Sequence, residues 1–410
     1  MQEVDIYSPK YCQDWQEKSL YDLAIWKNGL AFKDINFSNK GKPVIKIAEL
    51  KNGITAQTKF TKDIFEDAVH ITKGDMVFSW SGNPQTSIDV FYYDLEDGWL
   101  NQHIFKITTK KEVLKNYFFY TLKYLKPNFK MIAANKQTTG LGHVTINDLK
   151  KIKIKLPPLA EQKRIASILS SFDDKIELNN KTNKILEEMA QTIFEEWFIN
   201  FNFPNANGKP YKKSGGEMIG SELGEIPKGW KILTLKDIVN IVKGKKPTAT
   251  SDKITKKFTM PYLTIDCYNN EKSEYTEYNE KMHVKELDIV MVMDGNAGRI
   301  FYGKEGILSS TMAKFVIEDE NLNEIVFNFL KSIEYDLMYH TVGSVIQHAD
   351  KQYILNKKFC VPINNLERLS DIFKEIRRKV ALNKKENEKL SGIRDSLLPK
   401  LMAGEIRAKK

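Results

Sequence analysis

The sequence contains little cysteine and no long hydrophobic run, and both shortages exclude classes of protein. Its 410 residues include 3 cysteines, Cys12, Cys267 and Cys360, which lie far apart in the sequence. An odd and scattered set excludes a disulfide-stapled scaffold and a four-cysteine zinc site, and it fits a reducing compartment. The longest aliphatic run, residues 289–293, is far shorter than the roughly 20 residues of a membrane span. No secretory signal opens the chain, so we expect a cytoplasmic protein.

The sequence also lacks the motifs of an enzyme that acts on DNA alone. An amino-methyltransferase needs an Asn/Asp-Pro-Pro-aromatic loop, but the one Pro-Pro pair, Pro157-Pro158, follows a leucine. A nucleotide-binding P-loop needs a Ser or Thr after its lysine, and residues 298–304 are followed by Glu305. Histidines and cysteines show no pair at metal-ligand spacing. We therefore expect no catalytic residue, metal or cofactor on this chain.

The composition is that of a folded protein with a basic excess. Hydrophobic residues make up 41% and charged residues 28%, and 63 Lys plus Arg against 53 Asp plus Glu leave a net charge of +10. This excess permits a nucleic-acid partner without proving one. The length allows two or three domains of about 150 residues.

The chain repeats itself. Residues 15–23 match residues 230–238, and Gly29 then matches Gly244 at the same offset of 215. Further matches follow in the same order: residues 43–47 with 261–265, 74–83 with 287–296, and 138–140 with 341–343. Short β-branched and aromatic runs with turn signals, and one helix near residues 112–125, predict a mixed α/β domain in each half.

A long helix follows each mixed domain. The pattern predicts a first mixed domain at 1–157, a first helix at 158–202, a linker at 203–229, a second mixed domain at 230–361, and a second helix with a tail at 362–410. Apolar residues recur in each helix at alternating steps of four and three, which is the spacing of a coiled coil. The two series are Ile165, Leu169, Phe172, Ile176, Asn179, Asn183, Leu186, Ala190, Ile193 and Trp197, and, with an offset of 204, Leu369, Phe373, Ile376, Val380, Asn383, Asn387, Leu390, Arg394, Leu397 and Leu401.

Two asparagines interrupt each series, and they predict how the helices pair. A seam asparagine needs a polar partner and so sets the register. Antiparallel pairing places Asn179 opposite Asn387 and Asn183 opposite Asn383; a parallel pair would also align them, and two unrelated surface helices are the simpler alternative. Only the antiparallel pair relates the repeats by a pseudo-twofold axis, and we adopt it. It would hold the mixed domains apart along a rod of roughly 48 Å.

Three smaller expectations concern the ends of this pair. Arg394 would face Phe172, with the coil end open or the guanidinium stacked on the ring. Asp173 and Asp174 would lie on the solvated exterior. Pro399 would end the regular helix before Leu401.

The order of these parts resembles the DNA-specificity subunit of type I restriction–modification enzymes. The resemblance rests on residues 156–166 (LPPLAEQKRIA), on 225–230 (EIPKGW) and on 394–406 (RDSLLPKLMAGEI). It implies an α+β fold with two target recognition domains separated by two conserved helices in an antiparallel coiled coil. Each domain would read one part of a split, asymmetric target in double-stranded DNA. The resemblance also implies two methyltransferase subunits as partners, restriction subunits as further partners, and S-adenosylmethionine, ATP and Mg²⁺ on those partners. The alternative is a coiled-coil adaptor that reads no DNA.

Candidate DNA contacts are polar or basic residues at turns that recur in both halves, since such residues contact phosphates and base edges. For any one of them, a plain strand connection is the simpler alternative. The candidates are Trp80, Ser81, Asn83, Lys136, Gln137, Thr138, Thr139 and His143 in the first half, and Lys243, Lys245, Lys246, Asp294, Asn296, Arg299, Gln347, His348 and Lys351 in the second half.

Overall fold

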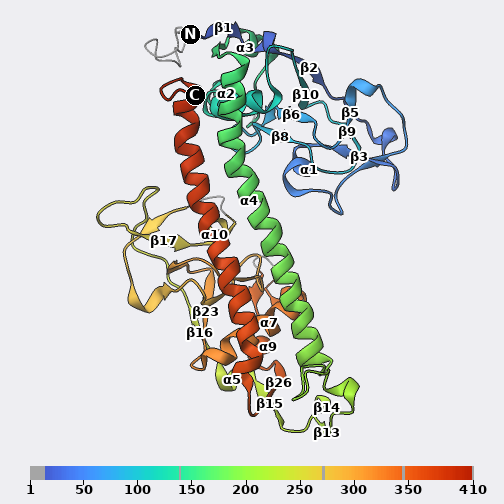
Figure 1. The fold of residues 1–410 in the computed structure, drawn as a ribbon, viewed down its shortest axis with the longest axis vertical. Coiled ribbons are helices and arrows are strands. Elements are labelled where there is room, and N and C mark those ends of the chain that lie inside the picture. Colours follow the sequence, from blue (N-terminus) through green and yellow to red (C-terminus); the bar gives the residue numbers. More distant parts are fainter. Residues whose placement is uncertain (1–13, 138–139, 270–272, 344–346, 409–410) are drawn as a thin grey trace. The chain divides into compact units, whose positions relative to one another are not determined.

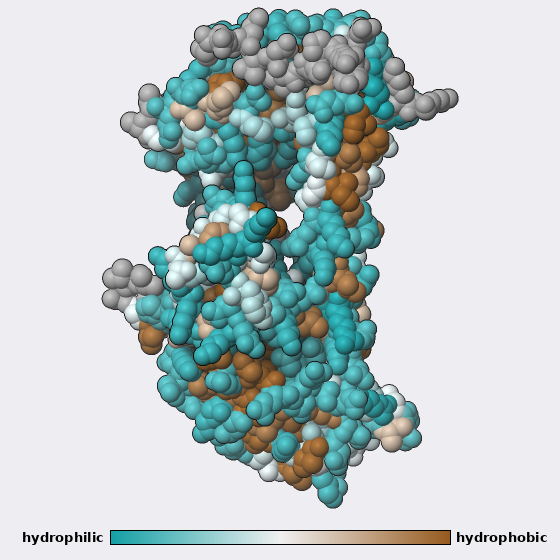
Figure 2. Space-filling view, turned by 90° about the vertical axis from the view of Figure 1, so that its left-hand side faces the viewer, coloured by the Kyte–Doolittle hydropathy of each residue, from teal (hydrophilic) through white to brown (hydrophobic). Residues whose placement is uncertain are grey.

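The chain forms two compact units, each built from one mixed domain and segments of both long helices. The computed structural model describes residues 14–137, 140–269, 273–343 and 347–408 (Figure 1). Unit 1 comprises Met1–Lys175 and Lys389–Lys410, and unit 2 comprises Ile176–Glu388. No helix among the described residues is long and apolar enough to cross a membrane. The face drawn in Figure 2 is mainly hydrophilic, with hydrophobic residues confined to separate patches.

The described residues of unit 1 form two four-stranded sheets and two strand pairs. One sheet is antiparallel and the other contains one parallel pair, β3 with β9. The strands, in sheet order, are β2(Ala24–Asn28), β10(Ile104–Thr109), β6(Met76–Ser79) and β8(Asp89–Tyr92); then β4(Phe60–Thr61), β3(Lys42–Ile45), β9(Gly98–Leu100) and β5(His70–Ile71); then the pairs β1(Gln16–Ser19) with β12(Lys153–Leu156) and β7(Ser81–Gly82) with β11(Gly142–His143). The helices are α1(Ile47–Asn52), α2(Lys115–Asn135) and α3(Ile146–Lys151).

Unit 2 repeats this strand order, and it too contains one parallel pair, β17 with β22. Its strands, in sheet order, are β16(Asn240–Lys243), β23(Met312–Val316), β20(Ile289–Val292) and β21(Ile300–Phe301); then β18(Tyr275–Thr276), β17(Met260–Leu263), β22(Gly306–Leu308) and β19(His283–Val284); then the pairs β15(Trp230–Thr234) with β26(Lys358–Pro362), β24(Thr341–Val342) with β25(His348–Ala349), and β13(Met218–Ser221) with β14(Gly224–Pro227). The helices are α5(Leu235–Ile238), α6(Ile265–Tyr268), α7(Glu320–Ser332), α8(Glu334–Tyr339) and α9(Lys351–Leu355). The repeat inferred from sequence is therefore a repeat of topology.

One helix, α2 in unit 1, lies where the sequence predicts a helix, and it packs aromatic residues into the core. Tyr117 and Phe118 are fully buried, and Phe119 stacks on Tyr92 at a ring separation of 4.4 Å. The helix continues through Pro127 to Asn135, beyond the predicted stretch, because its second half also buries apolar side chains such as Phe129.

Two long helices, α4(Leu159–Phe194) and α10(Leu366–Met402), are antiparallel within each unit (Figure 1). In unit 2 the predicted asparagine pairing is confirmed. Asn179 Nδ2 donates to Asn387 Oδ1 at 2.8 Å, and Asn383 Nδ2 donates to Asn183 Oδ1 at 2.7 Å. The buried amides of Asn179, Asn183 and Asn383 thereby meet another polar group, which offsets the cost of removing them from water.

The predicted ends of the helices need two corrections, both in unit 1. Asp173 is not a solvated exterior residue, because it pairs with Arg394 and accepts a hydrogen bond from Tyr120 Oη at 2.5 Å. The guanidinium of Arg394 is thus held by a carboxylate. The prediction that Pro399 ends the helix before Leu401 was also wrong. Pro399 removes one helical hydrogen bond, and the burial of Leu401 and Met402 in the core of unit 1 offsets that cost.

Candidate nucleic-acid interface

In unit 1, two of the candidate segments meet at a short strand pair. Strand β7, just after β6, pairs with β11 so that Ser81 lies opposite His143. Ser81 is buried, and its Oγ lies 2.9 Å from His143 Nδ1. The turn after β6 and the segment around His143 therefore lie together, and we call Trp80, Ser81 and His143 site 1.

Trp80 forms the aromatic part of site 1. Its ring stacks on Phe105 with centroids 5.5 Å apart, and His103 and His143 lie 5.9 and 5.8 Å from it. The indole Nε1 donates to Asn28 Oδ1 at 3.0 Å. Burial, and to a lesser degree His143, lowers the pKa of His103, which favours a neutral ring.

Three other candidates of unit 1 have internal partners or lie at its edge. Asn83 Oδ1 accepts from the backbone of the turn that follows it, at 2.9 Å from Gln85 N, which is a structural role. Lys136 binds both oxygens of Asp148 at 2.5 and 2.6 Å. Gln137 is exposed just beyond α2. Thr138 and Thr139 lie outside the described residues.

In unit 2 a charged cluster takes the equivalent place. Asp294 forms a β-bridge with His348, whose Nδ1 lies 2.7 Å from Asp294 Oδ1, and Lys243 Nζ lies 2.9 Å from Oδ2. Burial raises the pKa of Asp294, but the hydrogen bonds from His348 and Lys243 outweigh it, so the pKa lies below its usual value. This cluster, which we call site 2, therefore carries an ionised carboxylate near neutral pH.

The backbone shows that the two sites are equivalent. Val144 N donates to Trp80 O at 2.8 Å, and Ala349 N donates to Met293 O at 2.8 Å. Trp80 thus corresponds to Met293, and one residue further on Ser81 corresponds to Asp294.

A repeated glycine supports this equivalence. A Cβ on Gly29 would lie 2.2 Å from Asn101 O, and one on Gly244 would lie 2.1 Å from Ser309 O. Each glycine therefore lets the end of its strand approach the facing backbone closely. The preceding residues, Asn28 and Lys243, are held at matching places, and the repeat was the signal in the sequence that could have identified Asn28.

The remaining candidates of unit 2 surround site 2 or lie apart from it. Gln347 contributes its backbone carbonyl, which accepts from Gly295 N at 2.9 Å. Asn296 is exposed in the turn after β20, and the Arg299 guanidinium lies over the Phe301 ring at 5.6 Å. Lys245, Lys246 and Lys351 are exposed, the first two after β16 and the third in α9.

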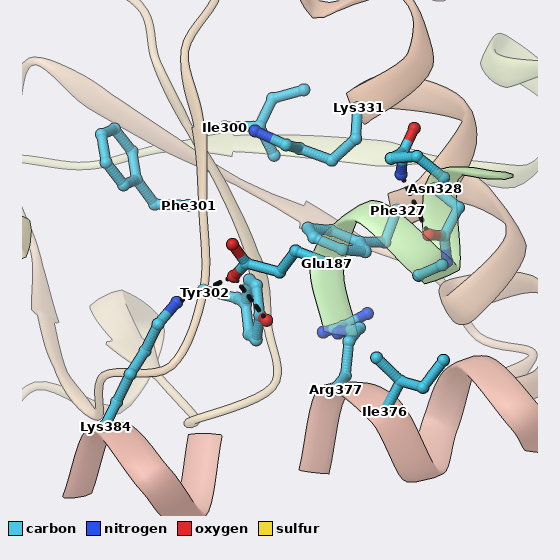
Figure 3. A pocket seen from close by; sticks show the side chains of 12 residues that line it. Glu187, Ile300, Phe301, Tyr302, Phe327, Asn328, Lys331, Ile376, Arg377 and Lys384 are labelled. Carbon is cyan, nitrogen blue, oxygen red and sulfur yellow. Dashed lines mark hydrogen bonds and ion pairs between the residues drawn. The ribbon is translucent and has the colours of Figure 1, made fainter. Parts of the chain in front are cut away.

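Unit 2 also contains a cavity of about 220 Å³ between its mixed domain and its helix segments (Figure 3). Glu187 accepts from Tyr302 Oη at 3.2 Å and from Lys384 Nζ at 3.3 Å. Arg377 lies over the Phe327 ring at 4.4 Å and pairs with the buried Glu324 at 3.3 Å. The cations of this cavity thus have carboxylate partners.

Chemically, sites 1 and 2 offer hydrogen-bonding groups, imidazoles and a lysine, and site 1 adds an indole. No group of three or more His, Cys, Asp or Glu residues that could hold a metal occurs in the part of the chain that the structure describes. Such groups can bind the polar edges of DNA bases and the phosphates of the DNA backbone.

Comparisons with known proteins also point to DNA recognition. The family model for the type I restriction modification DNA specificity domain matches residues 12–188 and 227–391. The type I restriction enzyme MjaVIII specificity subunit of Methanocaldococcus jannaschii is 27% identical over 394 residues, which are 90% of this chain and 86% of that protein. The MjaIX specificity subunit of the same organism is 28% identical over 76% of this chain and 73% of its own length.

A solved structure shares the fold. The S subunit of a type I restriction-modification system from M. genitalium superposes with a TM-score of 0.57 at 16% identity, covering 96% of this chain and 97% of that one. With the family model matching both halves, the chain belongs to the type I restriction–modification DNA-specificity family.

Proposed function

We propose that this chain is the non-catalytic specificity subunit of a type I restriction–modification complex and reads a bipartite, asymmetric DNA target. The observation that carries the proposal is the pair of equivalent sites on one repeated scaffold, which present different chemistry: Trp80, Ser81 and His143 in site 1 against Lys243, Asp294 and His348 in site 2. Different groups at the same place select different base edges, since bases differ in their donors and acceptors. Each unit would therefore read its own part of the target.

The two long helices would determine the gap between those parts. Their antiparallel register is specified in unit 2 by the buried asparagine pairs, and continuous helices are stiff over this length. We propose that they act as a ruler, so that helix length sets the number of unread base pairs.

The helices would also bind two methyltransferase subunits. Each helix exposes apolar residues outside the seam at matching positions: Ile168, Leu178 and Met189 in α4, and Ile372, Leu382 and Ile393 in α10, again with an offset of 204. Leu178 and Leu382 are the most exposed of them, at 57% and 60%. Repetition of the same apolar positions suits two copies of one partner, because exposed apolar stripes mark contact surfaces. Those partners would hold S-adenosylmethionine and transfer the methyl group, and restriction subunits would use ATP and Mg²⁺.

Leu178→Asp and Leu382→Asp test this docking. Each change should release one methyltransferase copy, measured as the mass of the co-purified complex. Lys184→Asp, a charge change at an exposed position on another face of α4, is the control. Retention of both copies in both leucine variants would contradict the docking proposal.

Salt dependence and competition separate DNA reading from the adaptor alternative. A DNA reader loses affinity steeply as salt rises, because bound counterions are released, and it keeps its preferred sequence against random DNA. An adaptor would show a flat salt response and no preferred sequence. We expect the first behaviour from the full chain with its methyltransferase subunits.

A further inference from the structure

A cleft of about 450 Å³ opens in unit 2 beside site 2. Its polar lining comes from Asn296 in the turn after β20, Arg299 before β21, and Lys331 and Glu334 in the helical segments that follow. Asn296 is two residues from Asp294, and the intervening Gly295 is hydrogen-bonded to Gln347. The cleft therefore adjoins site 2, the surface that we propose reads DNA, through the turn that carries Asp294 and Asn296.

Its charges leave one cation without a counterion. Glu334 is engaged on both oxygens: Oε2 pairs with Lys331, and Oε1 accepts from Ile300 N at 2.7 Å. Arg299 has no carboxylate partner among the described residues, and its guanidinium only packs over the Phe301 ring. A half-buried guanidinium that lies beside a ring and has no carboxylate partner can donate its N–H groups to a planar or tetrahedral oxyanion.

Unit 1 carries the opposite charge at the same position. Strand register makes Val77 equivalent to Val290, since each is the second residue of its strand; Val77 lies opposite Phe91, and Val290 lies opposite Phe301. Two residues earlier on the partner strand, Asp89 corresponds to Arg299.

In unit 1 that carboxylate is already satisfied. Asp89 pairs with Lys123 at 3.0 Å and with Lys126 at 2.5 Å. Burial raises its pKa, but the two lysines outweigh burial and hold it below its usual value. Because Asp89 is ionised and already bound by two lysines, an anion cannot bind at this position of unit 1.

The neighbouring cavity of Figure 3 does not compete for an anion. It shares Ile300, Phe301 and Lys331 with the cleft, and Lys331 lies beside Ile300 at its edge. Its other cations, Lys384 and Arg377, are paired with Glu187 and Glu324. The uncompensated charge of this region is thus at Arg299.

We propose that Arg299, with Asn296 and Lys331, binds one backbone phosphate of the DNA half-site read by unit 2, and that unit 1 makes no equivalent contact. This inference rests on the proposed function. The contact would anchor unit 2 on the duplex and leave base choice to site 2, because phosphate contacts position a protein without reading sequence.

The test compares Arg299→Ala, Arg299→Lys and the control Arg378→Ala in the full chain with its methyltransferase subunits. Arg378 is an exposed arginine of the same unit that pairs with Glu375. We expect Arg299→Ala to weaken binding of target DNA by roughly tenfold and to lower the slope of log affinity against log salt by about 1. Arg299→Lys should keep the slope and lose part of the affinity, and Arg378→Ala should change neither.

Methylphosphonate DNA locates the contact. Neutralising one phosphate at a time should reveal one position, in the unit 2 half-site, where the wild type loses affinity and Arg299→Ala does not. An unchanged slope in Arg299→Ala, or equal sensitivity of both proteins at every phosphate, would overturn the inference while leaving DNA reading intact. Absence of sequence-preferring binding by the wild type would instead overturn the proposed function and this inference with it.

Discussion

The two units share strand order and turn positions, yet the residues at matched positions of the two sites and of the cleft differ in kind. Ser81 stands where Asp294 stands in the other unit, Asn28 where Lys243 stands, and Asp89 where Arg299 stands. The glycines that let strand ends approach the facing backbone are the same in both. Residues that determine the backbone are therefore retained between the two units, while residues of the proposed DNA-binding sites differ.

The largest expected effect comes from shortening both helices by one facing heptad. A heptad contributes about 10 Å of rise, close to 3 base pairs of DNA. Both half-site sequences should persist, and the gap between them should shrink by about 3 base pairs or methylation should be lost. Sequencing of methylated sites measures this. An active variant with an unchanged gap would contradict the proposal that helix length sets the gap.

Next in size are changes that break one site and spare the other. Asp294→Ala should lower preference for the unit 2 half-site by roughly tenfold, because a lost base contact costs about 1–3 kcal/mol. Ser81→Ala, which removes the buried hydroxyl that holds the His143 imidazole, should lower preference for the unit 1 half-site only. Competition binding with DNA altered in one half-site at a time gives both numbers. Equal losses at both half-sites in either variant would contradict separate reading.

The asparagine pair of unit 2 offers a stability test. Asn179→Leu or Asn387→Leu alone should destabilise by about 1–3 kcal/mol, because each leaves the facing amide, half-buried in Asn387 and buried in Asn179, with one partner fewer. The double change should cost less than the sum, by roughly 1 kcal/mol, measured by denaturant unfolding. Additive effects would mean that the two amides do not depend on each other.

The smallest effect concerns Asp148, which binds Lys136 in unit 1. Burial raises its pKa, but hydrogen bonds from Lys136 and Thr145 outweigh it, and the pKa lies below its ordinary value of 3.8. An aspartate with a lowered folded-state pKa stabilises the folded state at pH values above its unfolded-state pKa. This stabilisation is lost as the pH falls through the folded-state pKa.

Unfolding measured against pH checks this. The stability advantage of the wild type over Asp148→Asn should be constant above about pH 5, near 1–2 kcal/mol, and shrink below about pH 4. Lys136→Ala should lower stability and leave DNA affinity unchanged. A loss of DNA affinity without a loss of stability would make Lys136 a DNA contact after all.

Sequence reasoning predicted the repeat and the helix pairing because both depend on periodic signals. A constant offset and two asparagines were enough to place Asn179 against Asn387. The predictions failed at the helix ends, where local sequence preferences compete with tertiary packing. Burial of Leu401 offset the cost of Pro399 in the helix, and Asp173 pairs with Arg394 instead of facing solvent.

The sites could be predicted only in part. Turn residues that recur in both halves marked Ser81 and Asp294, and the structure brings each to a histidine from a distant segment. Which polar side chains are spent on internal partners was not visible in the sequence. In the sequence, Lys136, Asn83 and Gln137 are equally plausible DNA contacts. Only the fold shows that Lys136 binds Asp148 and that Asn83 binds the backbone of its own turn.

Methylated-site sequencing of a host with and without this gene tests the central claim, that two equivalent surfaces with different chemistry read two parts of one target. We expect one gene-dependent motif with two unlike halves and a fixed gap. A gene-dependent motif that is continuous, or halves that are identical, would contradict it, and so would the absence of any gene-dependent motif.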